Sequence, residues 1–324
     1  MSRMREFGNR LYSGERSIDF VGKRKIWYAI AAVVVILSVA LPVLRGGFNF
    51  GIEFRGGSEF RLTNSQSLQQ SVAVDAVQSI VPGAQVSVTT VGAEDLRIQT
   101  QQLEDEQSEA VRLALAEAFN MDSSLVASSF IGPNWGAEIT RQALIGLFVF
   151  LGIVSLLMAF YFRSWKMSAA ALLALAHDLI FTIGVYAGVG FEVTPAAVIG
   201  FLTILAYSLY DTVVVFDKVR ENTLGVELSE TRTFGEAVNL AVNQTLVRSI
   251  NTSVVSVLPV AAILFIGSIL LGAGTLRDIS LALFVGTIVG TYSSVFLAAP
   301  IYVHLREREP ALKAAADKVL ASRQ

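Results

Sequence analysis

Long apolar blocks, each bounded by polar residues, dominate the pattern along the chain. Six of them cover about residues 26–44, 137–162, 167–189, 195–216, 248–271 and 276–303. Each is close to or above the roughly 20 apolar residues that a helix needs to span a bilayer core. The first block is longer than the apolar core of a cleavable signal peptide, so we expect it to be an uncleaved anchor. The pattern predicts an all-α membrane bundle of six helices.

One sizeable polar segment, 45–136, separates the first two blocks and has the pattern of a small α+β domain. Period-two alternation predicts strands at 58–63, 85–91, 95–99 and 125–131, with a hairpin turn near Gly92 and Ala93. Helical spacing predicts helices at 68–80 and 104–119, and the acidic run from Glu104 favours a solvated first turn. The order βαββαβ predicts a ferredoxin-like, split βαβ arrangement.

Basic residues gather in alternate polar segments. The N-terminal tail 1–25, the short loop after 162, the connection 217–247 and the C-terminal tail 304–324 are rich in Lys and Arg, whereas 45–136 is acidic. Cytoplasmic segments carry the excess of Lys and Arg. We therefore expect a multi-pass protein of the plasma (cell inner) membrane, with both termini in the cytoplasm. Segment 45–136 would lie outside, and 137–303 would form the remaining five-helix bundle.

The composition limits the chemistry. The chain is 53% hydrophobic and 16% charged, has no cysteine, and carries a net charge of −2, whereas soluble domains are about a quarter charged. Its two histidines, His177 and His304, lie too far apart to form a local metal motif. We find no phosphate-binding loop, nucleophile elbow or metal-spaced cluster. We therefore expect no enzymatic activity, cofactor, metal or nucleic-acid partner, and energy must come from a gradient or a partner.

Ionisable residues inside the apolar blocks are the candidate functional residues. Asp211 lies near the end of the fourth block, Asp178 follows His177 in the third, and Arg248 opens the fifth. A carboxylate at mid-helix costs roughly 2.5–3.5 kcal/mol on insertion scales, so it faces the bundle interior, pairs, or stays protonated. We predict that Asp211 pairs with Arg248. Their pair is either a static salt bridge or part of a proton pathway, and Asp178 is either a member of that pathway or a structural hydrogen-bonding group.

Polar residues near these charges are candidates for supporting roles. Tyr207 and Ser208 precede Asp211 by about one turn on the same face, and Asn251 and Thr252 share a helical stripe with Arg248. Adjacent residues on a helix point about 100° apart, so His177 and Asp178 are not expected to be a ready-made hydrogen-bonded pair. Asp217, beside basic residues at the helix mouth, is better explained as an interfacial structural residue than as a relay member.

Several motifs resemble the SecF family. Residues 207–222 read YSLYDTVVVFDKVREN, which is similar to the family's fourth-helix signature, with Lys218 where Arg is common. The segments IDFVGKRK at 18–25, GIEFRGG at 51–57 and GPNWGAE at 132–138 also resemble family motifs, with Glu53 where Asp is usual. So do His177-Asp178 and QTLVRS at 244–249. The resemblance extends over nearly the whole chain.

This resemblance implies a fold and a function. The fold would be the six-helix half of an RND-type assembly, completed by a SecD subunit. The partners would be SecD, the SecYEG channel, an unfolded preprotein and membrane lipid, and the proton-motive force would drive export. Asp211 would match the family's proton-pathway aspartate and Arg248 the arginine beside it. The alternatives are an RND-type exporter of small molecules or lipids, disfavoured by the small outer segment, and a non-transporting scaffold.

Overall fold

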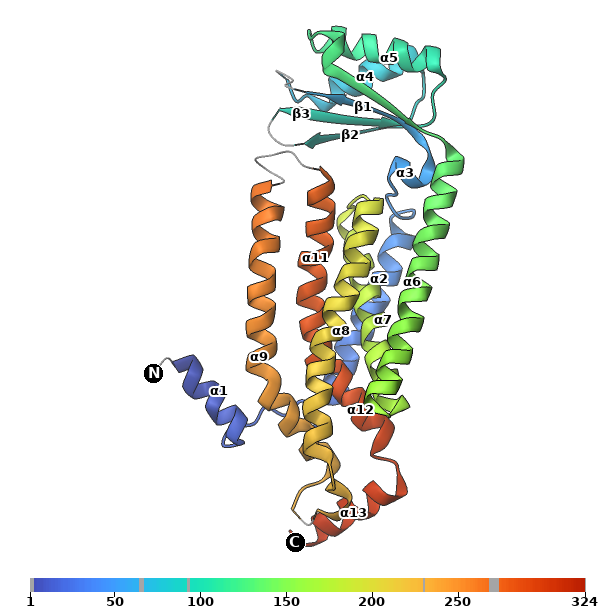
Figure 1. Cartoon of the computed structure of the whole chain (residues 1–324). Helices are drawn as coiled ribbons and strands as arrows, with labels where there is room; N and C mark the ends of the chain where they lie inside the picture. The colour runs from blue at the N-terminus through green and yellow to red at the C-terminus, as the bar shows by residue number, and fades with distance from the viewer. Residues whose placement is uncertain (1–2, 64–66, 92–93, 230, 268–273, 324) are drawn as a thin grey trace.

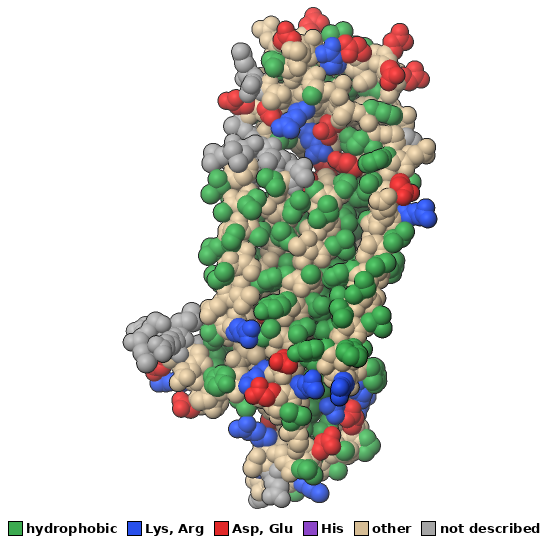
Figure 2. All heavy atoms as spheres, in the orientation of Figure 1, with side chains coloured by type: hydrophobic (Ala, Val, Ile, Leu, Met, Phe, Trp, Pro, Cys, Tyr) green, Lys and Arg blue, Asp and Glu red, His purple; other side chains and the backbone are tan. Residues whose placement is uncertain are grey.

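The computed structural model of the chain describes residues 3–63, 67–91, 94–229, 231–267 and 274–323. Within these ranges, six stretches are helical, long and apolar enough to cross a membrane. They are built from α2 (Arg24–Leu44), α6 (Pro133–Phe162), α7 (Trp165–Val189), α8 (Pro195–Thr223), α9 (Phe234–Ala262) and α11 (Gly274–Ser293), which α12 (Ala299–Arg306) continues. These helices form one bundle (Figure 1), with green apolar side chains along the middle of the face shown in Figure 2 and charges gathered toward its ends. The predicted six-helix bundle is confirmed.

Two helices extend past the predicted apolar blocks. Helix α8 continues to Thr223, and α9 begins at Phe234, well before Arg248. A capping box starts α9, in which the Thr233 hydroxyl accepts from the Glu236 backbone and the Glu236 side chain accepts from the Thr233 backbone. Hydropathy misses such polar extensions because they lie beyond the apolar zone. Helix α9 passes into a π-helix, η3 (Ile263–Gly267); the predicted end of that block at 268–271 lies outside the described residues.

Helices α8 and α11 pack closely against each other in the bundle interior. A Cβ on Gly286 would lie 2.3 Å from Cγ1 of Ile204, and one on Gly290 would lie 2.8 Å from Cβ of Ser208. Glycine is required at both positions because any side chain would separate the two helices. The spacing of these two glycines, four residues apart, is typical of close helix packing in membranes. Below Gly290, the last membrane helix changes register in a second π-helix, η4 (Ser294–Ala298).

A four-stranded sheet caps one end of the bundle, which we term the sheet end; the opposite end is the far end. The domain comprises β1 (Gly57–Leu62), α4 (Gln70–Ile80), β2 (Val86–Val91), β3 (Asp95–Thr100), α5 (Asp105–Ala118), the short 3₁₀-helix η1 (Ser123–Leu125) and β4 (Val126–Ile131). The strand order is β2-β3-β1-β4, with every neighbouring pair antiparallel. The predicted strands and helices are confirmed, while the predicted turn at Gly92 and Ala93 lies outside the described residues.

Helices α4 and α5 cover one face of this sheet, and the other face points toward the bundle (Figure 1). Phe60 of β1 and Ile98 of β3 oppose each other and are fully buried against α4 and α5. Acidic Asp105 and Glu106 occupy the first turn of α5, as expected for a solvated helix start.

The sheet domain is joined to the bundle by close backbone contacts. The short helix α3 (Ile52–Arg55) leads into β1 and packs on α6, where a Cβ on Gly136 would lie 2.2 Å from the Phe54 carbonyl oxygen. Phe50 forms an isolated parallel bridge with Val193 in the α7–α8 connection. Contacts with α6 and with the α7–α8 connection therefore fix the orientation of the sheet domain on the bundle.

The remaining short elements lie toward the far end. Helix α1 (Arg3–Ser13) projects from the side of the bundle there, and α13 (Pro310–Ala321) folds beneath it (Figure 1). The 3₁₀-helix η2 (Val226–Leu228) lies in the α8–α9 connection, where α13 packs on it.

Candidate functional site: two buried carboxylates between four helices

Among the described residues, Asp178 of α7 is one of two fully buried carboxylates in the bundle interior and is 2% exposed. Its Oδ2 accepts hydrogen bonds from Ser208 Oγ of α8 at 2.5 Å and from Ser293 Oγ of α11 at 2.7 Å. The neighbouring His177 Nδ1 lies 3.3 Å from the other carboxylate oxygen. The expectation that adjacent His177 and Asp178 are not a ready-made hydrogen-bonded pair is therefore wrong, because this ring nitrogen lies within hydrogen-bond distance of the carboxylate.

Asp211 of α8 is 5% exposed and has an equivalent pair of partners. Ser249 Oγ of α9 donates to its Oδ1 at 2.8 Å, and Ser294 Oγ donates to its Oδ2. Each carboxylate thus joins its own helix to two others. Because Ser293 and Ser294 are consecutive, one segment of the last membrane helix contacts both aspartates.

The predicted pairing of Asp211 with Arg248 is wrong. Within the described ranges neither Asp211 nor Asp178 pairs with a Lys or Arg side chain, and Arg248 is exposed on the outer surface of α9. Successive helix residues differ by about 100° in direction, so turning Ser249 toward Asp211 turns Arg248 away. Arg248 nevertheless lies at the same level of the bundle as Asp211.

The other predicted residues occupy varied positions. Tyr207 is partly buried, and its hydroxyl has no hydrogen-bond partner among the described residues. Thr252 Oγ1 donates back to the Arg248 carbonyl at 2.9 Å, and Asn251 is exposed. Asp217 is exposed and accepts from Tyr161 Oη at 3.4 Å, in agreement with an interfacial role.

Sequence reasoning missed the serines at positions 249, 293 and 294. Ser293 and Ser294 follow Gly286 and Gly290 at intervals of three to four residues, and so continue the small-residue face of α11. That spacing was a usable signal, because small hydroxyl residues at a close helix contact can reach polar groups on the neighbouring helix.

The arrangement buries two carboxylates that have hydroxyl partners but no Lys or Arg partner among the described residues. An ionised carboxylate away from water is costly unless it is paired or well hydrogen-bonded, and protonation removes that cost. Two hydroxyl donors hold each carboxylate, but they bring no compensating positive charge. The hydrogen bonds between these helices therefore depend on the charge of each aspartate.

A second charged cluster, also missed from the sequence, lies between the sheet and the bundle. The Arg97 guanidinium of β3 is 2.7 Å from Glu59, 3.4 Å from Glu192 and 3.8 Å from Glu53. Burial raises the pKa of the Glu53 carboxyl above its ordinary value, and Arg97 opposes this. Burial works against the charge of Arg97, but the surrounding carboxylates hold the pKa of its guanidinium above the ordinary value. Asp278 lies beside this cluster and accepts from Thr194 Oγ1 at 2.9 Å.

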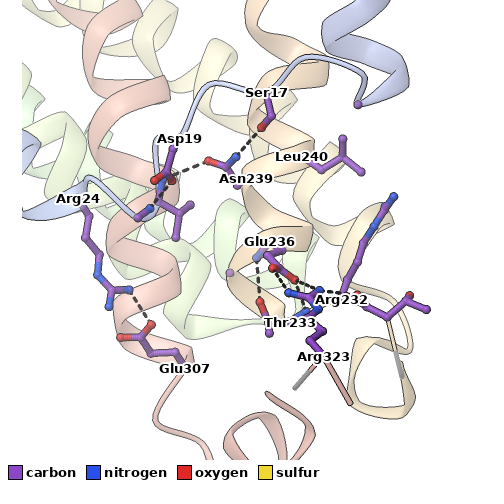
Figure 3. Close-up of a pocket in the computed structure, with 15 residues that line it drawn as sticks. Ser17, Asp19, Arg24, Arg232, Thr233, Glu236, Asn239, Leu240, Glu307 and Arg323 are labelled. Atoms are coloured by element: carbon purple, nitrogen blue, oxygen red, sulfur yellow. Dashed lines mark hydrogen bonds and ion pairs between the residues drawn. The ribbon is translucent and has the colours of Figure 1, made fainter. Parts of the chain in front are cut away.

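A polar pocket of ≈ 590 Å³ lies at the far end, between the segment before α2 and the start of α9 (Figure 3). Figure 3 shows Asn239 pointing toward Ser17, where its amide nitrogen donates to the hydroxyl at 3.1 Å. Two of the arginines lining the pocket are paired, Arg24 with Glu307 at 2.6 Å and Arg323 with Glu236 at 2.7 Å. These contacts tie both terminal segments to the bundle. Among the described residues no group of three or more metal-ligating side chains is found.

Comparisons with known proteins identify relatives over the full length. The family model described as protein export membrane protein SecD/SecF, C-terminal, matches residues 111–308. The chain is 44% identical to the protein translocase subunit SecF of Streptomyces coelicolor, covering 100% of this chain and 86% of the relative. It is 42% identical to the subunit of the same name from Mycobacterium tuberculosis, covering 98% and 73%.

Solved structures show the same arrangement. The crystal structure of SecDF from Thermus thermophilus, described as a translocon-associated membrane protein, matches with a TM-score of 0.78 and 30% identity. The match covers 90% of this chain and 39% of the SecDF chain, so the present chain spans about two fifths of that protein.

Proposed function

This chain belongs to the SecF branch of the SecD/SecF family of protein export membrane proteins, and we propose that it uses the proton-motive force to promote preprotein export. It would act with a SecD subunit at the SecYEG channel. The membership itself supports a role in export by a multi-pass membrane protein. The coupling to protons is supported by the two buried carboxylates.

The single observation that carries the proton coupling is the pair Asp178 and Asp211, buried with hydroxyl partners and without a Lys or Arg partner among the described residues. One charge moving through the whole membrane potential yields about 2.3 kcal/mol per 100 mV. This is comparable to the roughly 2.5–3.5 kcal/mol cost of a charge at mid-helix. Protonation can therefore supply enough free energy to shift the packing of α7, α8, α9 and the last helix.

The supporting residues are assigned by position. Tyr207 has a free buried hydroxyl, among the described residues, for a proton or a water, and Ser208 links Asp178 to α8. Arg248, Asn251 and Thr252 lie on the side of α9 that faces away from this chain's interior, so we place them against a partner subunit. A charged residue at membrane depth faces protein or a water-filled cavity, not lipid.

The partner we propose is SecD. The relative from Thermus thermophilus is named SecDF, and this chain is 33% identical to it while covering 40% of its length. A second subunit or half would supply the remainder of such an assembly. Apolar side chains on α2, α6 and α9 are exposed in this chain, and either lipid or the partner would cover them.

We also propose the orientation and the class of the sheet domain. The alternation of basic segments supports cytoplasmic termini and a sheet domain outside the membrane. The strand order β2-β3-β1-β4, with α4 and α5 on one face, supports a ferredoxin-like, RND-type architecture. Energy would come from the proton gradient without enzymatic catalysis or a cofactor.

The decisive experiment is export of a secreted reporter in cells whose only copy carries Asp211→Asn. We expect export to fall to the level of depleted cells, because the amide keeps the shape but cannot titrate. Asp217→Asn, at an exposed position six residues along the same helix, is the matched control and should export normally. Protein level and co-purification with SecD should equal wild type in both variants. Normal export by the Asp211→Asn variant would contradict the proposal.

A further inference from the structure

We propose that Ser293 and Ser294 form a hydrogen-bond switch that transmits the protonation of both buried carboxylates to the last membrane helix. This inference rests on the proposed function and assigns positioning residues to it. Both serines are fully buried. They lie at the junction where α11 ends and the π-helix η4 begins.

The two serines contact different aspartates on different helices. Ser293 Oγ donates to Asp178 of α7 at 2.7 Å, and Ser294 Oγ donates to Asp211 of α8. Adjacent residues can do this because their directions differ by close to a right angle on a helix. The last membrane helix is thus hydrogen-bonded to both carboxylates through one peptide unit.

Each of these serines also has a second acceptor one turn back along its own helix. The Gly290 carbonyl lies 3.2 Å from Ser293 Oγ, and the Thr291 carbonyl lies 3.2 Å from Ser294 Oγ. A hydroxyl has one proton to donate, so it serves either the carboxylate or the carbonyl well. In the described structure, the partners on α8 and α9, Ser208 and Ser249, have no such second acceptor for their hydroxyls.

Protonation of a carboxylate changes which acceptor is preferred. An ionised carboxylate attracts the hydroxyl proton strongly, since hydrogen bonds to charged groups are about twice as strong as neutral ones. A protonated carboxyl instead needs an acceptor for its own proton, which the serine oxygen provides once its hydrogen turns to the backbone carbonyl. The acceptor of the serine proton therefore depends on whether the aspartate is ionised or protonated.

The backbone at this point is suited to respond. π-Helical turns interrupt the regular ladder of hydrogen bonds and are frequent at functional sites. At the neighbouring Gly290, α11 lies in close contact with Ser208 of α8. A small shift of the two serines therefore changes the distance between α8 and α11. When the Ser294 hydroxyl turns to its backbone carbonyl, a neutral and weaker hydrogen bond replaces the charge-assisted link between α8 and the last membrane helix.

The test measures carboxyl titration in the purified complex with SecD, reconstituted in lipid nanodiscs. Infrared difference spectra of ¹³C-aspartate-labelled protein are recorded against pH, and the bands are assigned by their loss in Asp211→Asn and Asp178→Asn. We expect Ser294→Ala to move the midpoint of the Asp211 band upward by about one to two pH units, because the ionised form loses one charge-assisted hydrogen bond. Ser293→Ala should do the same to the Asp178 band.

Two further variants separate a switch from a purely structural role. Ser294→Thr keeps the hydroxyl and should keep the midpoint of the Asp211 band at its wild-type pH. Ser280→Ala, at a buried serine of α11 about 20 Å along the helix, should leave the midpoints of both bands unchanged. The inference is overturned if Ser294→Ala leaves the midpoint in place, or if Ser280→Ala shifts it equally. If Asp211→Asn abolishes export while Ser294→Ala changes neither export nor titration, the inference fails and the proposed function stands. Normal export by Asp211→Asn would overturn the proposed function itself.

Discussion

Replacing Arg97 by methionine should loosen the sheet domain from the bundle. Arg97 contributes the positive charge at a junction of three carboxylates from three segments: Glu59 in β1, Glu53 in α3 and Glu192 in the α7–α8 connection. Methionine keeps much of the length and the apolar stem but removes the guanidinium. Three acidic side chains would then face one another across the junction without the arginine.

The size of the effect follows from the exposure of these groups. Their side chains are 17% (Arg97), 22% (Glu59), 25% (Glu53) and 16% (Glu192) exposed. Breaking a fully buried ion pair by removing one partner costs about 3–5 kcal/mol. Partial exposure lets water solvate the remaining carboxylates, so we expect a cost of about 2–3 kcal/mol for the docked arrangement. That corresponds to roughly a 30- to 150-fold increase in the population of opened junctions.

Hydrogen–deuterium exchange measures this opening directly. Amides of the α7–α8 connection, including Val193, which donates to the Asn49 carbonyl at 2.7 Å, should exchange faster by about that factor in Arg97→Met. Amides of α4 and α5 should keep their protection, because the domain core is not touched. Arg61→Met is the matched control, since Arg61 is 46% exposed and its ion pair with Asp95 lies within the domain. Equal exchange at Val193 in both variants would refute the reasoning.

Three further predictions concern other contacts. Burial raises the pKa of Glu53, so proton binding favours the docked junction below this raised pKa and the effect is lost as pH rises through it. Glu53→Gln should abolish the pH dependence of the protection factors at the junction, that is, of exchange relative to the intrinsic amide rate at each pH. Gly286→Val should lower thermal stability by about 1–3 kcal/mol by pushing α8 from α11, whereas Gly152→Val, at a helix position with open space, should not. Asn239→Ala removes hydrogen bonds to the segment before α2, including 2.8 Å to the Phe20 amide, and should speed trypsin cleavage there.

Much of the fold could be predicted because its determinants are local. The alternation in 58–63 and 95–99 became β1 and β3 almost residue for residue, and the apolar blocks became the bundle. The start of α9 could not be read from hydropathy, because its first turns are polar and are fixed by the Thr233–Glu236 capping box and contacts with the N-terminal segment. Arg97 and Glu192 lie 95 residues apart in the numbering, and their contact depends on how the domain docks.

At the candidate site, the sequence identified the buried carboxylates but not the direction in which α9 faces. Asp178 and Asp211 were identifiable because carboxylates in apolar helices are costly, whichever way they face. The direction of α9 was not identifiable, since Arg248, Asn251 and Thr252 form a polar stripe on one side and Ser249 and Ser253 form another. Both stripes avoid lipid, one by facing this chain's interior and the other by facing a surface that a partner can cover.

The structure resolves that ambiguity in a way that bears on assembly. The small serines turn inward, where Ser249 reaches Asp211 and Ser253 contacts Thr291 of α11, while the long arginine turns outward. An arginine at the depth of Asp211 would be strongly disfavoured against lipid, so this face of α9 requires protein or water beside it. A stripe that seemed to belong to the chain's own interior is therefore better explained as belonging to the interior of a larger assembly. Arg248 should accordingly become protected from solvent and lipid probes when the SecD partner binds.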